Sequence, residues 1–183
     1  MQKKEIAIFS GSFNPIHAGH LMLASYICSF TCIDEVWLVV SPHNPLKEAD
    51  DLLDDDHRLE MVRSALLPFD NLKASDVEFR LPRPSYTIDT LDHLVSHHPD
   101  KHFTLVIGAD NWNRLPLWKE YERLLHSYPM LIYPRAGEEV VIPEGLSEGI
   151  RLVDAPMIEI SSTFIRLSIR EGRDMRAFVP ERA

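Results

Sequence analysis

Cysteine is scarce in this chain of 183 residues, which has only Cys28 and Cys32. The two lie four residues apart in an apolar segment, where a helix would place them on one face and a disulfide across one turn would be strained. Two cysteines give no disulfide framework, and a metal site would need two further ligands that are not close in sequence. We therefore expect buried or partly buried thiols in a reducing compartment.

Long apolar runs are also lacking. No segment approaches the roughly 18 residues of a membrane span. The start, MQKKEIAIFS, is basic and then apolar, but its apolar part is far too short for the core of a signal peptide, and no cleavage site of small residues follows. The sequence predicts a first strand here, in a cytoplasmic protein with no membrane partner.

Positive charge is in the minority. Lysine and arginine total 19 against 28 aspartates and glutamates, so the formal net charge is -9. This balance argues against a duplex nucleic acid or an anionic membrane as partner, since either would require a basic face. A small phosphate ligand remains compatible, because a few local donors are enough to bind it.

What the chain has is an alternation of short apolar runs with segments of helical periodicity. This pattern is typical of an α/β protein with a Rossmann-like, doubly wound and mainly parallel sheet that carries helices on both faces. We expect a single domain over residues 1–183. The predicted strands are 5–10, 35–41, 103–108, 130–133 and 150–154, and the predicted helices are 20–30, 57–67, 86–98, 117–127 and 162–172.

The unusual polar residues follow the predicted strands. In an open α/β sheet, ligands bind outside the carboxyl ends of the strands, so segments that follow strands should meet at one edge. The segment SHHPDKH (96–102) precedes a strand instead, and we expect it to be a solvated turn on the opposite rim. The residues expected at the ligand-binding edge are His17, His20, His43, Lys47, Asp110, Trp112, Arg135, Ser161, Ser162, Thr163 and Arg166.

Two of these segments suggest phosphate binding. GSFNPIHAGH (11–20) concentrates two of only 7 glycines and two of 9 histidines in ten residues. We expect His20 to begin a helix and both histidines to donate to phosphate oxygens, partly protonated near neutral pH. ISSTFIR (160–166) offers hydroxyl groups at a helix start and a guanidinium one turn later. No nucleophile paired with a base stands out, so the chemistry should be positioning and charge stabilisation.

With these motifs the chain resembles the nucleotidyltransferase superfamily, whose signatures are an HxGH loop and an ISSTxIR segment. PSYTIDTL (84–91) and VIGADNWNRLPLWKEYERLL (106–125) narrow the resemblance to bacterial nicotinate-nucleotide adenylyltransferases, over residues 5 to 180. The resemblance implies transfer of the adenylyl group of ATP to nicotinate mononucleotide. The products would be deamido-NAD and pyrophosphate, a step of NAD biosynthesis.

The resemblance also implies roles for individual residues. His17, His20, Lys47 and Arg166 would be catalytic. Nicotinate mononucleotide would meet Ser12, Lys47, Tyr86, Thr87, Asp110, Trp118 and Arg135, with Trp118 stacked on the pyridine ring. The residues themselves predict Ser85, before an amphipathic segment, as the N-cap of the helix that Tyr86 and Thr87 begin. ATP would meet Gly11, Ser12, Phe13, His17, His20, Gly108, Asp110, Ser161, Ser162, Thr163 and Arg166.

Some points stay open at this stage. Mg²⁺ should accompany ATP rather than occupy a protein metal site. Many family members carry Pro-Pro-His-Lys after the second strand, whereas this chain has HNPLK, so His43 has no certain counterpart. The alternatives are a phosphopantetheine, nicotinamide-nucleotide or cytidylyl transferase, or a nucleotide-binding regulator without catalysis. A homo-oligomer is compatible with all of them.

Overall fold

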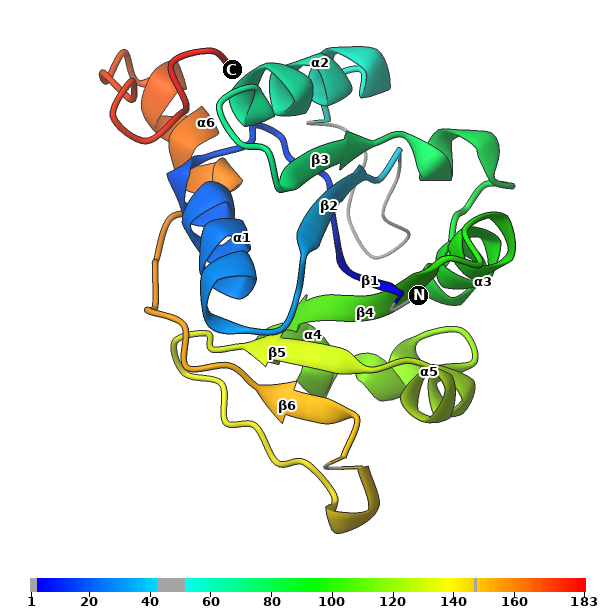
Figure 1. Ribbon diagram of the computed structural model, residues 1–183. Coiled ribbons are helices and arrows are strands. Elements are labelled where there is room, and N and C mark those ends of the chain that lie inside the picture. Colours follow the sequence, from blue (N-terminus) through cyan, green and yellow to red (C-terminus); the bar gives the residue numbers. More distant parts are fainter. Residues whose placement is uncertain (1–2, 43–51, 147) are drawn as a thin grey trace.

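A parallel sheet forms the centre of the molecule. The computed structural model describes residues 3–42, 52–146 and 148–183. Every strand pairing in the sheet is parallel, and the strand order is β3-β2-β1-β4-β5-β6 (Figure 1). The strands are β1 (Lys4–Gly11), β2 (Glu35–Val40), β3 (Leu72–Ser75), β4 (Lys101–Gly108), β5 (Met130–Tyr133) and β6 (Ile150–Leu152).

Helices cover both faces of the sheet, which confirms the predicted Rossmann-like α/β fold. Helices α1 and α2 lie over one face, and α3, α4 and α5 lie over the other (Figure 1). The helix α6 lies beside α1, close to the C-terminus. The helices are α1 (Ala18–Phe30), α2 (Asp55–Leu66), α3 (Thr87–His97), α4 (Ala109–Asn113), α5 (Tyr121–Ser127) and α6 (Ser162–Arg170).

Alternation along the strands divides the core in two. Successive side chains of a strand point to opposite faces, so Ala7 and Phe9 of β1 pack with α1 and α2, while Ile6 and Ile8 pack against α3. All four are almost inaccessible to solvent. Burial on both faces explains why the central strands read as continuous apolar runs rather than as alternating ones.

The strand order reverses between β1 and β4, which are direct neighbours, with Ile8 opposite Leu105. Such a switch point leaves a crevice at the carboxyl ends of the two strands, because the chain leaves them in opposite directions. The segments that follow these strands are the ones that begin with Gly11 and Gly108. The topology therefore places the GSFNPIHAGH and GAD segments side by side at the usual ligand-binding position.

Three sequence-based assignments of secondary structure were wrong. The strand β3 was not predicted, because only Leu72 of its four residues is buried and the segment carries no apolar run. The predicted helix 117–127 is a 3₁₀ turn over Leu115–Leu117 followed by α5, with Glu120 between them at a left-handed φ of 51°. The helix α1 begins at Ala18 rather than at His20.

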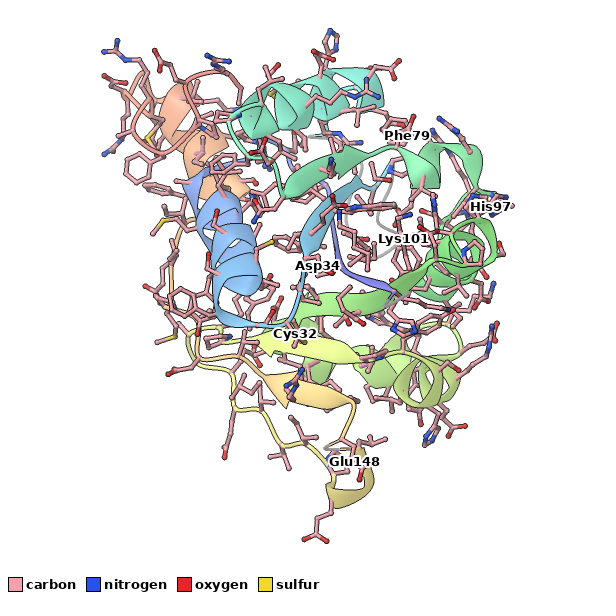
Figure 2. The ribbon with its side chains drawn as sticks, viewed as in Figure 1. Cys32, Asp34, Phe79, His97, Lys101 and Glu148 are labelled. Carbon is pink, nitrogen blue, oxygen red and sulfur yellow. The ribbon has the colours of Figure 1, made fainter. Side chains whose placement is uncertain are left out.

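The opposite rim carries no part of the candidate site. Figure 2 shows His97 at the end of α3 and Lys101 at the start of β4, away from the carboxyl ends of the strands. His97 is exposed, as expected for the turn at 96–102. In the described part of the chain, no helix has the length and apolar character needed to cross a membrane.

Candidate active site

Two histidines face each other at the start of α1. His17 is the N-cap residue, and its backbone N–H donates to Nδ1 of His20 at 3.2 Å. The two rings stack with their centroids 3.7 Å apart. Gly19 makes this arrangement possible, since a Cβ there would lie 3.1 Å from Nδ1 of His17. Gly19 is the glycine of the HxGH signature.

The ring of His17 is neutral near pH 7. Burial, with a smaller contribution from the positive charge of Arg135, lowers the pKa of His17 to about 4. Only 5% of the residue is exposed, and its Nδ1 is buried without a hydrogen-bond partner among the described residues. The expected partial protonation is therefore wrong for His17 in the free protein. The ring can still donate one hydrogen bond through its single N–H.

The turn before these histidines is fixed by packing. Phe13 has a left-handed φ of 44°, and a Cβ on Gly11 would lie 3.2 Å from its ring. The ring of Phe13 is 1% exposed and packs edge-on to His20, with centroids 4.9 Å apart. The side chain of Phe13 therefore belongs to the core and supports His20. Only its backbone, with those of Gly11 and Ser12, remains to line a nucleotide cleft.

The end of β4 leaves no room for a side chain. A Cβ on Gly108 would collide with Oδ1 of Asp110 and lie 3.0 Å from the ring of Tyr133. The same Oδ1 is 3.5 Å from Nε of Arg135, while Nη2 of Arg135 donates to the hydroxyl of Tyr133 at 3.2 Å. Oδ1 of Asp110 is buried and accepts no hydrogen bond from the described residues. It is thus an available acceptor beside the switch point.

The helix α6 contacts the loop after β1. Ser161 caps α6 by accepting from the backbone N–H of Phe164 at 3.1 Å. Ser162 donates to the carbonyl of Pro15 at 2.9 Å, and Nη1 of Arg166 donates to the carbonyl of Asn14 at 2.8 Å. Thr163 is exposed in the first turn. The structure therefore brings the two signature segments together, with α6 holding the loop that precedes His17.

A pocket opens between these segments. It lies against the stacked histidines, the end of β5 and the chain that leads to α6. Its lining residues are Phe9, His17, Gly19, His20, Leu23, Tyr133, Pro134, Arg135, Ala155, Pro156, Ile158 and Ile160. The lining combines imidazole rings and a guanidinium with apolar side chains, which suits a ligand with a phosphate group and a flat apolar part.

The start of α3 lies against the segment around Trp118. Tyr86, not Ser85, is the N-cap residue of α3, which corrects the predicted cap. Lys119 pairs with Asp89 at 2.9 Å and lies 4.9 Å above the ring of Tyr86. These contacts hold the chain beside Trp118 against the first turn of α3. Nε1 of Trp118 is buried without a partner among the described residues.

Arg58 of α2 is a further residue that sequence analysis missed. Its side chain is fully buried, and its guanidinium donates to the carbonyls of Ser12 at 2.6 Å and of Ser41 at 2.9 Å. It also donates to Leu53 at 2.9 Å and to Oδ1 of Asp55 at 2.5 Å. One buried cation thus fixes the chain leaving both β1 and β2. The expected roles of His43 and Lys47 fall outside the described residues.

Comparisons with known proteins agree with this arrangement. The model of the cytidylyltransferase-like family matches residues 8–168. Proteins from Bacteroides thetaiotaomicron and Bacteroides fragilis, each named "Probable nicotinate-nucleotide adenylyltransferase", are 49% and 48% identical to this chain. The alignments cover 97% and 98% of this chain and 87% and 89% of those relatives.

Solved structures share the fold. The Plasmodium falciparum nicotinic acid mononucleotide adenylyltransferase complexed with NaAD matches with a TM-score of 0.75 at 23% identity, over 96% of this chain and 90% of that one. The same enzyme complexed with APC gives a TM-score of 0.73 at 22% identity, with the same coverage. The chain therefore belongs to the cytidylyltransferase-like family of nucleotidyltransferases, in the group of the bacterial nicotinate-nucleotide adenylyltransferases that it matches over nearly its full length.

Proposed function

We propose that this protein is a nicotinate-nucleotide adenylyltransferase. A phosphate oxygen of nicotinate mononucleotide attacks the α-phosphorus of ATP, the bond to the bridging oxygen breaks, and pyrophosphate leaves. The product is deamido-NAD, an intermediate in NAD biosynthesis. The observation that carries the proposal is the stacked pair His17 and His20 at the N-terminus of α1, beside the switch point of the sheet.

The histidines act on the phosphates of ATP. The N-terminus of α1 carries the partial positive charge of the helix dipole, which favours an anion. His17 donates through its single N–H, and His20 donates beside it. Donors of this kind, fixed before the reaction, stabilise charge that develops on the phosphoryl oxygens without a cost of reorganisation. Arg135 adds a positive charge on the far side of the same pocket.

The helix α6 and the loop after β2 complete the ATP site in this proposal. The exposed hydroxyl of Thr163 and the positive N-terminus of α6 face the triphosphate, with Ser161 capping the helix and Ser162 and Arg166 keeping the loop after β1 in place. We assign Lys47, which lies outside the described residues, the role of a further cation for the phosphates. Mg²⁺ enters with ATP as part of the substrate, bound mainly to the phosphate oxygens. In the described part of the chain, no three His, Cys, Asp or Glu side chains cluster as a metal site.

Nicotinate mononucleotide occupies the side formed by α3 and Trp118. The backbone N–H groups of Tyr86 and Thr87 lie at the N-terminus of α3, where a helix leaves its donors without intrahelical partners. Two such donors suit a carboxylate, which only accepts, whereas an amide would turn an NH₂ donor toward one of them. Trp118 stacks on the pyridine ring, and Asp110 and Ser12 lie between the two substrates.

The remaining properties are part of the same proposal. We infer one nucleotidyltransferase domain over residues 1–183, because the candidate site draws on segments from β1 to α6. A cytoplasmic location fits a consumer of ATP with two free cysteines. The homo-oligomer stays a prediction.

The test is formation of pyrophosphate and dinucleotide from ATP and a panel of acceptors. We expect kcat/KM for nicotinate mononucleotide to exceed that for nicotinamide mononucleotide by at least about tenfold, since a mismatched buried donor costs roughly 1–3 kcal/mol. Phosphopantetheine and CTP-dependent acceptors serve as controls for the sibling activities and should give no product. Equal values for acid and amide, or no dinucleotide at all, would refute the proposal.

A further inference from the structure

A buried carboxyl group lies behind the proposed acceptor site. Glu78 is only 4% exposed and sits in a 3₁₀ turn, Val77–Arg80, between β3 and α3. Its Oε2 accepts from the hydroxyl of Ser85 at 3.0 Å. Its Oε1 accepts from Thr90 at 3.3 Å and from Ser10 at 3.4 Å. The hydroxyl of Ser41 contributes a further hydrogen bond.

The partners of Glu78 are all neutral. Burial raises its pKa, and the four hydroxyl groups only lower it in part. Among the described residues no lysine, arginine or histidine forms an ion pair with it. A buried carboxyl without a cation is costly, and an apolar side chain of similar volume would serve a core equally well or better. Simple packing is therefore a poor account of a glutamate at this position.

The four hydroxyl groups belong to three separate parts of the candidate site. Ser85 and Thr90 flank Tyr86 and Thr87, and Thr90 also contacts the carbonyl of Tyr86 through its backbone N–H at 3.1 Å and its hydroxyl at 3.2 Å. Ser10 directly precedes Gly11 at the end of β1. Ser41 follows β2, and its backbone N–H donates to the carbonyl of Gly11 at 2.9 Å.

Glu78 thus ties the start of α3 to the carboxyl ends of β1 and β2. The hydrogen bond with Ser10 joins this turn directly to β1, 68 residues away in sequence, whereas the strand that precedes the turn, β3, pairs with β2 and not with β1. Since a displacement of about 1 Å between reacting groups can cost a large factor in rate, the position of this turn relative to β1 matters for transfer.

We infer that Glu78 is a positioning residue for the acceptor: through Ser85 and Thr90 it fixes the Tyr86–Thr87 donors relative to the phosphate-binding end of β1. The inference rests on the proposed function, because it assigns the acceptor carboxylate to those donors. Glu78 itself contacts no substrate. It acts on the selection and alignment of nicotinate mononucleotide and leaves the binding of ATP to His17, His20 and α6.

Glu78→Gln tests this with little change in shape. An amide in place of the carboxyl offers one acceptor fewer, so the hydroxyls of Ser85 and Thr90 can no longer both donate to it together with Ser10. We expect KM for nicotinate mononucleotide to rise about tenfold, the acid-over-amide preference to fall, and KM for ATP to stay within about twofold. Ser85→Ala and Thr90→Val should each reproduce part of the shift. Glu60→Gln, on the exposed side of α2, is the matched control.

A rise in KM for nicotinate mononucleotide without a rise in KM for ATP distinguishes a positioning role from a loss of folded protein. A variant that is merely less well folded would lose kcat through its inactive fraction and keep both KM values. Unchanged KM for the acceptor, or an equal rise for ATP and acceptor, would overturn the inference. If the unmodified protein makes no deamido-NAD, the proposed function fails instead, and that result is read before any variant is made.

Discussion

The buried environment of His17 opposes protonation of its ring, and this lowers the stability of the folded protein at acidic pH. The pKa is lowered from 6.5 in the unfolded chain to about 4 in the folded protein, mainly by burial. Between those values the unfolded chain binds the proton and the folded protein does not, so His17 lowers stability as the pH falls through this window. Above pH 6.5 both states are mostly neutral and the contribution vanishes.

We predict that His17→Asn reduces this acid sensitivity. Between about pH 7 and about pH 4.5 the wild-type protein should lose about 2 kcal/mol more of its unfolding free energy than the variant, from a shift of this size. Urea denaturation at the two pH values measures it. His57→Asn changes an exposed histidine of α2 and should keep the wild-type slope. If the unfolding free energy of His17→Asn depended on pH as strongly as that of the wild-type protein, the lowered pKa of His17 would be contradicted.

At the scale of elements, α2 acts on the site through a single side chain. Arg58 donates from a fully buried side chain to backbone carbonyls in the loops after β1 and β2. Lysine carries the same charge but lacks the planar set of donors that reaches several carbonyls at once. The helix therefore depends on arginine at this position to hold two loops.

We predict that Arg58→Lys lowers the unfolding free energy by about 2–4 kcal/mol, because buried carbonyls and Asp55 lose donors. Turnover should fall as well, since the loop that leads to His17 loses its anchor at Ser12. Arg63→Lys on the exposed side of the same helix should change stability by less than about 0.5 kcal/mol. Chemical denaturation of the three proteins compares them directly. Equal denaturation midpoints for the two variants would show that the contacts of Arg58 with the two loops contribute nothing to stability.

The sequence predicted elements and motifs better than the contacts that support them. Apolar runs located five of the strands, and strand ends located the polar segments, because both signals are local. The roles of Arg58 and Glu78 were not predicted, because their partners lie up to 46 and 68 residues away in sequence. A charged residue inside a helical pattern is also normally assigned to the solvent side. His17 is an unusual N-cap residue, which explains the error at the start of α1.

At the scale of the whole molecule, the proposed function brings two substrates to one edge of the sheet, on either side of the switch point. We assign ATP to the pocket beside α1 and the end of β5, and the acceptor to the start of α3 and Trp118. Between them, the described residues offer donors and charges rather than a nucleophile with its own base. In the proposed reaction His17 and His20 donate hydrogen bonds to phosphate oxygens, so they stabilise charge and form no bond to phosphorus.

Transfer should therefore be direct, with the phosphate oxygen of the acceptor in line with the departing pyrophosphate. One displacement inverts the configuration at the α-phosphorus, whereas an adenylyl-enzyme intermediate requires two displacements and restores it. We predict inversion with ATP made chiral by sulfur at the α-phosphate, read by ³¹P NMR of the dinucleotide product. Retention would place a nucleophile at this edge, and incubation with labelled ATP alone would then leave the label on the protein. With direct transfer the protein stays unlabelled until acceptor is added, and the label then appears only in the dinucleotide.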